Sequence, residues 1–298
     1  MRIGVDVGGT KIEGIALDDG GGVRARLRVD TPRGDYEATL AAIRDVVGTI
    51  ERDAGPARSV GLGIPGTPSP ATGLVKNANS TWLIGRPFEQ DLERALGRPV
   101  RLANDANCFA LSEAIDGAAA GARVVFGVIL GTGCGGGIVV DRQVLTGPNA
   151  LAGEWGHNPL PWPRDGEWPG PPCYCGRTGC IETFLSGPGL ARDHAEGGGE
   201  TVTARKVAAR AEAGDATAVA ALERYEDRLA RALTGIINVL DPDVIVIGGG
   251  LSNVARLYDR VPARLRPFGG EAVRTSVLRA RHGDSSGVRG AAWLWPPA

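Results

Sequence analysis

The sequence has no long apolar run and no block of basic residues. No stretch reaches the roughly 18 to 20 uninterrupted apolar residues of a membrane-spanning helix, and the chain opens on a strand pattern rather than on a secretory leader. A formal net charge of -1 argues against nucleic acid or an anionic membrane as the main partner. We therefore expect a cytoplasmic globular protein whose 298 residues can form one large core or two ordinary ones.

Cysteine is scarce, with five residues in the chain, too few for a disulfide scaffold. Three of them, Cys173, Cys175 and Cys180, lie within eight residues, and this clustering suggests a metal. His157, sixteen residues before Cys173, can complete a tetrahedral Cys3His zinc site. Four protein ligands leave no position for water, so such a site is structural. The alternative is three reduced, buried cysteines and an unrelated histidine.

Two nucleotide-binding motifs are absent or incomplete. The chain contains no Gly-Lys dipeptide, which excludes a Walker A loop. The pattern G-x-G-x-x-G occurs at Gly61–Gly66 and at Gly131–Gly136, but the dinucleotide-binding version requires a helix to start on the glycines. The first pattern continues into a proline-rich loop and the second into the strand Ile138–Val140, so NAD is disfavoured.

A serine-hydrolase motif is also incomplete. Gly283–Gly287 fits G-x-S-x-G, yet no His, Asp or Glu follows Ser285 to complete a triad in the hydrolase order. We expect Ser285 and Ser286 to cap the last helix instead.

Glycine is abundant, with 46 residues concentrated between apolar strands. Ile3–Val7 and Ile12–Leu17 flank Gly8-Gly9-Thr10-Lys11, which predicts a hairpin with a glycine turn. Such a turn exposes amide hydrogens that can cradle phosphate oxygens, although many glycine turns only close hairpins. Asp6, just before the turn, could reach a phosphate-bound Mg2+ through water.

The same plan of strand, glycine turn and strand recurs later in the chain. Val124–Leu130 and Gly137–Val140 flank the turn that begins at Gly131. The repetition suggests two related halves, each presenting main-chain donors to one polyphosphate.

Residue patterns predict the remaining elements, with a loop over residues 146–172. We expect strands at Val23–Val29, Val60–Ile64, Val100–Ala103 and Val244–Ile247, and helices at Tyr36–Arg52, after Asp105, at Gly187–His194, Thr203–Ala213 and Ala216–Leu240, from near Asn253, and at Asp284–Trp295.

Asp105 is part of the sequence Asn104-Asp105-Ala106-Asn107, at the point where a predicted strand meets a predicted helix. The amide side chains of Asn104 and Asn107 lie on either side of it in the sequence. A carboxylate there lies near the positive end of the helix, and we interpret it as a general base. The alternative is that Asn104 or Asp105 only caps the helix. The segment Lys76–Trp82 is dense in amides and hydroxyls, as a polyol site requires.

Together these motifs resemble the ROK family of sugar kinases, and the resemblance extends to Gly287–Ala292. The segments that carry it are Asp6-Val7-Gly8-Gly9-Thr10-Lys11, Asn104-Asp105-Ala106-Asn107, Leu130-Gly131-Thr132-Gly133-Cys134-Gly135-Gly136-Gly137, Gly153-Glu154-Trp155-Gly156-His157 and Cys173-Tyr174-Cys175-Gly176-Arg177-Thr178-Gly179-Cys180-Ile181-Glu182.

The resemblance implies an α/β, actin-like ATPase (ribonuclease H-like) fold with two domains and an active site in the cleft between them. Residues 1–118, joined by a C-terminal helix at about 284–298, would form one domain, and residues 119–283, with the zinc loop, the other. A homodimer is the family's usual arrangement. Some members of the family carry a DNA-binding module before the kinase fold. Because the phosphate loop starts as early as Asp6, we expect no such module here.

The resemblance also implies a role for each matching residue. Asp105 would take the proton of the sugar hydroxyl. His157 would place one ring nitrogen on zinc and donate to the sugar from the other. The implied sugar contacts are Asn79, Asn104, Asp105, Glu154, His157 and Glu182; the implied nucleotide contacts are Asp6, Gly8, Gly9, Thr10, Lys11, Thr132, Gly133, Cys134, Gly135, Gly136, Gly137, Gly248, Gly249 and Gly250.

Within the family, Asn77–Trp82, Glu154–Trp162 and Ala291–Trp295 most resemble bacterial fructokinases that also accept mannose. We therefore expect ATP-dependent phosphorylation of fructose at the 6-hydroxyl, with Mg2+ and a structural Zn2+. Phe109–Leu111 and Arg279–Asp284 also fit N-acetylglucosamine kinases, so that activity, or a glucokinase activity, is the alternative. A non-catalytic sugar sensor on the same fold is the alternative from another class.

Overall fold

The computed structural model describes residues 1–270 and 272–295. The chain forms two compact units. The first unit comprises Met1–Gly121, Gly137–Ala152 and the chain from Arg281 onward, and the second comprises Ala122–Gly136 and Gly153–Ala280.

A five-stranded sheet in the order β3-β2-β1-β4-β7 forms the centre of the first unit. Its strands are β1 (Arg2–Val7), β2 (Lys11–Leu17), β3 (Val23–Asp30), β4 (Ser59–Ile64) and β7 (Val100–Asn104). β1 pairs antiparallel with β2 and parallel with β4, and β4 pairs parallel with β7. The carboxyl ends of β1, β4 and β7 therefore lie at one edge, where ligands bind in open α/β sheets. A short ribbon of β5 (Thr67–Pro68) and β6 (Val75–Lys76) lies outside this sheet.

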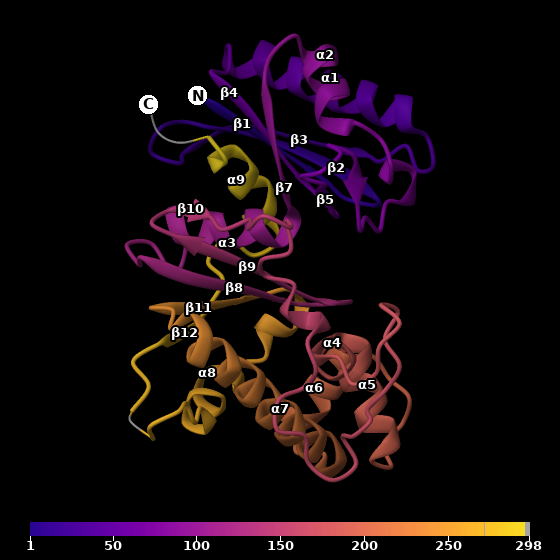
Figure 1. Ribbon diagram of the computed structural model, residues 1–298, viewed down its shortest axis with the longest axis vertical. Helices are drawn as coiled ribbons and strands as arrows, with labels where there is room; N and C mark the ends of the chain where they lie inside the picture. Colours follow the sequence, from indigo (N-terminus) through magenta and orange to yellow (C-terminus); the bar gives the residue numbers. More distant parts are fainter. Residues whose placement is uncertain (271, 296–298) are drawn as a thin grey trace. The chain divides into compact units, whose positions relative to one another are not determined.

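Helices cover both faces of this sheet (Figure 1). On one face α1 (Tyr36–Ala54), with α2 (Phe88–Leu96), packs over the larger apolar core, which includes Ile43 and Leu62. On the other face α9 (Ser286–Trp293) packs against Ile15 and Leu17. A Cβ on Gly4 would lie 2.1 Å from the carbonyl oxygen of Val288, so the missing side chain lets α9 approach the sheet.

α3 (Asp105–Ile115) packs against α9, and a buried carboxylate joins it to the start of that helix. Glu113 is fully buried, and its oxygens accept from the main-chain N–H groups of Arg281 and His282 and from Oγ of Ser286. The predicted capping serines behave differently from the expectation. Ser285 occupies the N-cap position without a side-chain capping bond, and Ser286 donates to Glu113 instead.

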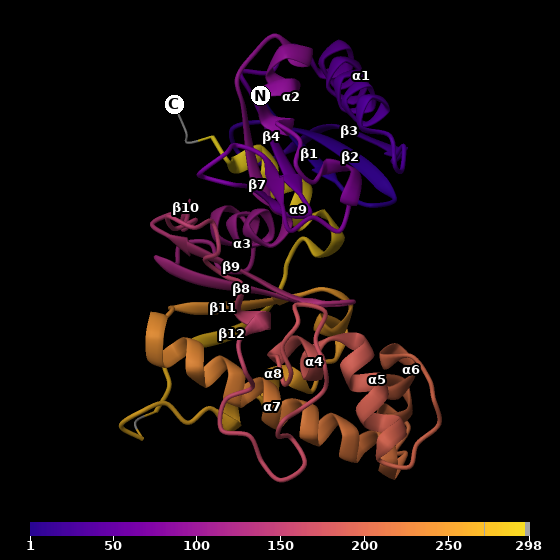
Figure 2. The ribbon, with the colours of Figure 1, turned by 45° about the vertical axis from the view of Figure 1, so that its right-hand side comes forward.

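A second sheet has the order β10-β9-β8-β11-β12. Its strands are β8 (Val124–Leu130), β9 (Cys134–Val140), β10 (Gln143–Val144), β11 (Val244–Gly248) and β12 (Ser276–Arg279), and β11 runs parallel to both β8 and β12. The helices of the second unit are α4 (Ile181–Leu185), α5 (Gly187–Glu196), α6 (Ala204–Glu212), α7 (Ala216–Leu240) and α8 (Leu257–Arg260). Figures 1 and 2 show α5 and α6 side by side next to α7.

The predicted elements are confirmed with small shifts, except at two glycine-rich positions. β9 begins at Cys134 rather than at Gly137, because residues expected in the turn already pair as strand. The helix expected from Asn253 is wrong: a 3-10 turn over Gly250–Asn253 ends there, and α8 starts only at Leu257.

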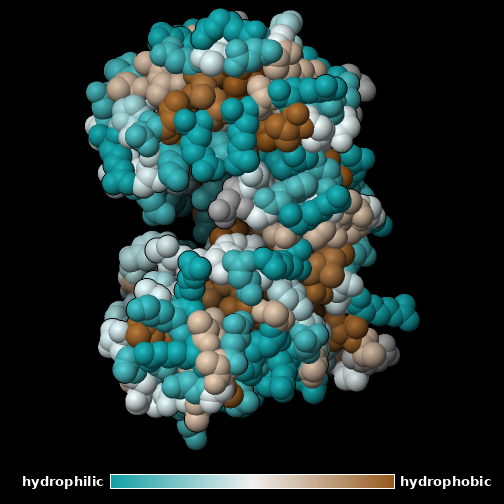
Figure 3. Space-filling model, turned by 180° about the vertical axis from the view of Figure 1, so that it is seen from behind, coloured by the Kyte–Doolittle hydropathy of each residue, from teal (hydrophilic) through white to brown (hydrophobic). Residues whose placement is uncertain are grey.

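No helix in the described part of the chain has both the length and the apolar character needed to cross a bilayer. On the face seen in Figure 3, hydrophobic residues form separate patches among hydrophilic ones. The large apolar side chains of β1, β4 and α1 are instead buried in the core.

Candidate active site

Asp6 and Asp105 lie at the same edge of the first sheet. Asp6 pairs in register with Gly63 of β4, and Gly63 pairs with Ala103 of β7, two residues before Asp105. Burial, and next the negative charges of Asp105 and Glu13, raise the pKa of Asp6 to about 7. Two interacting carboxyl groups therefore lie at this edge of the first sheet. Carboxylate oxygens are the ligands that divalent cations such as Mg2+ prefer, so the edge is a suitable place for one.

Asp105 is the first residue of α3 and is exposed. The helix is capped by Asn104, whose Oδ1 accepts from the N–H of Ala106 at 2.9 Å, while Oδ1 of Asp105 accepts from the same N–H at 2.8 Å. The Nδ2 group of Asn104 donates to the carbonyl of Gly66 at 3.4 Å. Asn104 is thus the residue that caps the helix. Asp105 lies at the helix N-terminus, where its hydrogen bond to Ala106 fixes the orientation of its carboxylate.

The first glycine turn is braced by two residues of the loop that follows β3. Thr31 Oγ1 donates to the carbonyl of Gly8 at 2.7 Å, and Arg33 Nε donates to that of Gly9 at 2.8 Å. Because a trans peptide points its C=O and the next N–H in opposite directions, these bonds direct the N–H groups of Gly9 and Thr10 away from the braces. The N–H of Gly8, an expected phosphate donor, instead closes the turn on the carbonyl of Lys11.

Asn79, a predicted sugar contact, is exposed in the segment after β6. Just before it, Nζ of Lys76 donates to the carbonyl of Asn149 at 2.9 Å, and Asn77 has a positive φ of 56°. The first unit therefore holds Asp6, the turn at Gly8–Lys11, Asn79, Asn104 and Asp105, and also Gly137.

The second glycine turn borders a cavity of about 1330 Å³ within the second unit. Its lining residues come from the ends of β8 and β11 and from α5 and α6, and include Gly131, Thr132, Gly187, Ala208, Gly250 and Asn253. Gly249, with φ of 79°, has no room for a side chain, because a Cβ would lie 2.4 Å from the carbonyl oxygen of Leu130. The structure thus brings Thr132 and Gly250, two predicted nucleotide contacts, to one cavity.

Glu182 of α4 reaches the same turn. The N–H of Cys134 donates to Oε2 of Glu182 at 2.8 Å, so this expected phosphate donor is already bonded within the protein. Glu154, the other predicted acidic sugar contact of the unit, is exposed beside a 3-10 turn at Trp155–His157.

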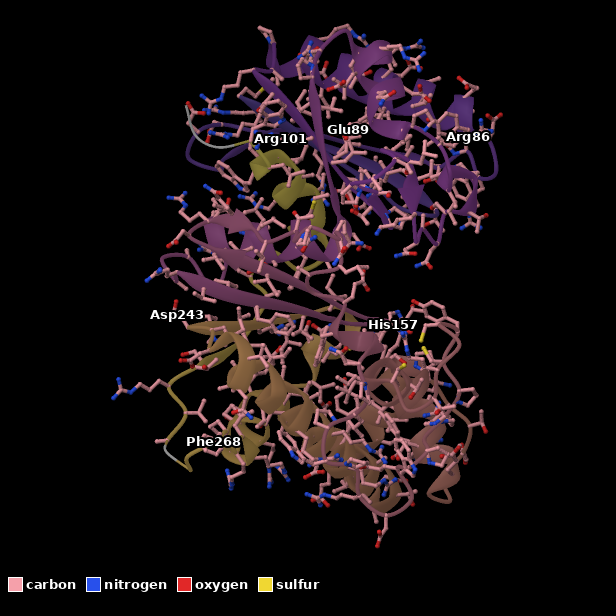
Figure 4. All side chains as sticks on the ribbon, in the orientation of Figure 1. Arg86, Glu89, Arg101, His157, Asp243 and Phe268 are labelled. Atoms are coloured by element: carbon pink, nitrogen blue, oxygen red, sulfur yellow. The ribbon has the colours of Figure 1, made fainter. Side chains whose placement is uncertain are left out.

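The four predicted zinc ligands come together. One ligand atom each from His157, Cys173, Cys175 and Cys180 lies within 4.8 Å of the others. Sγ of Cys175 and Cys180 are 3.6 Å apart, as are Sγ of Cys173 and Nδ1 of His157. Zinc-sulfur bonds of about 2.3 Å in a tetrahedron require separations of about 3.8 Å, so the residues fit a zinc ion. Figure 4 labels His157 beside the sulfur atoms, drawn in yellow.

One thiol of this cluster ionises readily. The main-chain N–H of Arg177 is the largest cause that lowers the pKa of Cys175, to about 6. Burial raises the pKa of the two remaining cysteines of the chain, Cys108 and Cys134, which stand outside the cluster.

The second nitrogen of His157 has a partner within the protein. Nε2, predicted to donate to a sugar, lies 2.9 Å from Oη of Tyr174. The sequence motifs assign no role to Tyr174, Thr31 or Arg33. Tyr174 stands between two predicted ligands and could have been noticed on that ground, whereas nothing in the local pattern marks the two bracing residues.

A sequence model of the ROK family matches residues 2–298. The chain belongs to the ROK family. Among its relatives, an N-acetyl-D-glucosamine kinase of Yersinia pseudotuberculosis is 42% identical over 299 residues, which are 99% of this chain and 98% of the relative.

Solved structures of other ROK proteins have the same fold. A ROK hexokinase from Thermus thermophilus superimposes with a TM-score of 0.84 and 33% identity over 98% of this chain and 97% of that one. A ROK family glucokinase from Streptomyces griseus, solved in complex with glucose and AMPPNP, has a TM-score of 0.77 and 28% identity over 98% of both chains. The expected actin-like, two-domain α/β fold of the ROK kinases is therefore confirmed.

Proposed function

We propose that this ROK protein is an ATP-dependent N-acetyl-D-glucosamine kinase that phosphorylates the 6-hydroxyl of its sugar. The assignment of the substrate rests on the 42% identity to the Yersinia enzyme over nearly the whole of both chains. Three short segments of the sequence favour fructose, and N-acetylglucosamine is the alternative that two other segments fit. Similarity over the whole chain is the stronger argument, so the alternative replaces fructose here.

Asp105 would accept the proton of the attacking hydroxyl. Its position at the N-terminus of α3, with Oδ1 fixed on the N–H of Ala106, supports this role because phosphoryl transfer depends mainly on alignment and charge neutralisation. The base need not be strong. A bound Mg2+ would neutralise phosphate charge, and Asp6 is the carboxyl group best placed near it at the sheet edge.

The glycine turns would hold the phosphates. In the first unit, the bracing by Thr31 and Arg33 aims the N–H groups of Gly9 and Thr10 outward. In the second unit, the cavity beside Thr132 and Gly250 is large enough for the adenosine of ATP. These features favour an enzyme over a non-catalytic sugar sensor, which needs no phosphate site.

Zinc would have a structural role. His157, Cys173, Cys175 and Cys180 would hold it and leave no open coordination position. The loop that carries the three cysteines has little core of its own, and the metal would fix it, and with it the ring of His157, next to Glu154 and Glu182.

Glucokinase activity is the second candidate, because the Streptomyces structure is a glucokinase with 28% identity to this chain. A coupled assay of ADP release with N-acetylglucosamine, glucose, mannose and fructose separates the possibilities. We expect the largest kcat/KM with N-acetylglucosamine. A higher value with another hexose would reassign the substrate, and sugar binding without ADP release from any of the four would indicate a sensor.

A further inference from the structure

The segment 158–172 joins two predicted zinc ligands, His157 and Cys173, and its outer part has no apolar core. Of residues 161–170, all within the described part of the chain, only Glu167 is buried, with 8% of its surface exposed. The two large apolar side chains of this stretch, Trp162 and Trp168, are both exposed. Because a buried carboxylate is costly unless it is paired, the partners of Glu167 show what holds the segment.

Two arginines of α7 bind the carboxylate of Glu167. Its Oε1 accepts from Nε of Arg228 at 2.7 Å and from Nη2 of Arg231 at 2.9 Å, and its Oε2 accepts from the same Nη2 at 2.8 Å. Nη1 of Arg231 donates to the carbonyls of Pro161 and Trp162 at 2.8 and 2.9 Å. The outer part of the segment is thus attached to α7 through charge-assisted hydrogen bonds at three residues.

Arg228 is itself held by two other helices. It is buried, and its Nη1 donates to Oδ1 of Asp193 in α5 at 2.6 Å. Its guanidinium lies over the ring of Phe184 in α4, 5.2 Å from the centroid. Glu167 is therefore attached to a side chain whose position is already fixed by the helical part of the unit.

The inner ends of the segment lie along the cysteine loop. Pro159 forms an antiparallel bridge with Cys180, and the N–H of Gly179 donates to the carbonyl of Pro171 at 2.9 Å. Pro159 and Pro171 each lie two residues from one of the two ligands that flank the segment. Attachment of the outer part to α7 therefore also restricts where those two ligands lie.

We propose that Glu167 is a positioning residue for the zinc site. Its bonds to Arg228 and Arg231 hold the segment in the conformation that brings His157 to the three cysteines. Without this attachment the segment would open, and metal binding would have to supply the free energy that orders it. The inference rests on the structural zinc of the proposed function and adds the residue that prepares the site for the metal.

Glu167→Gln tests the proposal, because the amide keeps the size of the side chain but loses the charge and one acceptor oxygen. Competition of the full-length protein with a chromophoric zinc chelator should give a Kd for zinc about tenfold higher than that of the wild type. The circular dichroism of the zinc-loaded variant should match the wild type, because all four ligands remain. Arg231→Gln removes the attachment from the α7 side and should weaken zinc binding similarly, so it carries the test if Glu167→Gln does not fold.

Glu226→Gln is the matched control. Glu226 is a fully buried glutamate of α7, and its carboxylate pairs with Arg256 and Arg264, which lie outside the segment. This variant should lower the midpoint of denaturant unfolding and keep the wild-type Kd for zinc. An unchanged Kd in Glu167→Gln would overturn the proposal. An equal rise of Kd in Glu226→Gln would overturn it as well, because loss of any buried ion pair would then weaken the site.

The zinc assignment fails separately from this inference. If the wild-type protein takes no zinc from the chelator, the zinc site and its positioning residue are both wrong. If the wild type binds zinc and Glu167→Gln and Arg231→Gln bind it equally well, only the role of Glu167 is wrong. The kinase assignment is tested independently, by the assay of ADP release.

Discussion

The main-chain N–H of Cys134 donates to Oε2 of Glu182 at 2.8 Å. This bond joins the glycine turn after β8 to the first turn of α4, which begins directly after the predicted zinc ligand Cys180. One side chain thus connects the segment proposed to hold phosphate with the segment proposed to hold sugar and zinc. A change in the turn should therefore be detected at the sugar site, even without nucleotide.

Gly133→Ala tests this connection. A Cβ at Gly133 would lie 2.7 Å from Oε2 of Glu182, so the carboxylate must shift. We expect the affinity for N-acetylglucosamine, measured by calorimetry without nucleotide, to fall about tenfold. Gly131→Ala is the control, because no atom lies within 4 Å of its Cβ, and it should bind sugar like the wild type. Equal affinities in both variants would show that Glu182 is not coupled to the sugar.

A bulky side chain in the cavity of the second unit should obstruct the nucleotide. Ala208 of α6 lines this cavity, so Ala208→Trp should raise KM for ATP at least about tenfold while the calorimetric Kd for the sugar stays unchanged. Ala213→Trp, at the exposed end of α6 and outside the lining residues, controls for the added indole. A wild-type KM for ATP in Ala208→Trp would place the nucleotide elsewhere.

We expect the Cys175→Ser variant to bind zinc much more weakly than the wild type, because the cluster then retains three of its four predicted ligands. Elemental analysis of the purified variant should show less than about a tenth of the wild-type metal, together with weakened sugar binding. Cys108→Ala removes a buried thiol that stands outside the cluster and should leave the zinc content unchanged. A wild-type protein that carries no zinc when purified without chelators would contradict this assignment.

The titration of Asp6 should make stability depend on pH. Its folded-state pKa of about 7 lies above its ordinary value of 3.8, so between these values the folded state binds more protons than the unfolded state. Stability must then fall as pH rises from about 4 to 7, by a few kcal/mol at most at about 1.4 kcal/mol per unit. Denaturant unfolding without Mg2+ or nucleotide should show this fall in the wild type and a flatter profile in Asp6→Asn. Parallel profiles would contradict the raised pKa.

The sequence predicted the backbone of the site better than its side-chain contacts. Short apolar runs on either side of Gly8–Lys11 and Gly131–Gly136 identify two pairs of strands joined by glycine turns. The spacing of Cys173, Cys175 and Cys180 identifies a possible metal cluster. Both patterns can be recognised because they are local in the sequence. The ligand set is confirmed as a group that could hold a metal. The roles of the individual site residues stay predictions.

Contacts that depend on the folded chain could not be predicted. Tyr174 meets His157 across 17 residues of loop, and Thr31 and Arg33 reach the first glycine turn from more than 20 residues away. Several short elements were also missed, α2 and β12 among them. α2 has only two fully buried residues, Phe88 and Leu92, among charged ones, and the four residues of β12 bury only Val277.

The measurement that tests the account most directly is the turnover of Asp105→Asn. The substitution keeps the size of the side chain and its place at the start of α3 but removes the carboxylate that would accept the proton. We predict that kcat for N-acetylglucosamine falls by roughly two to four orders of magnitude, while the calorimetric Kd for the sugar changes less than about threefold. A variant that retains near-wild-type kcat would show that Asp105 is not the base, and the proposed mechanism would be wrong.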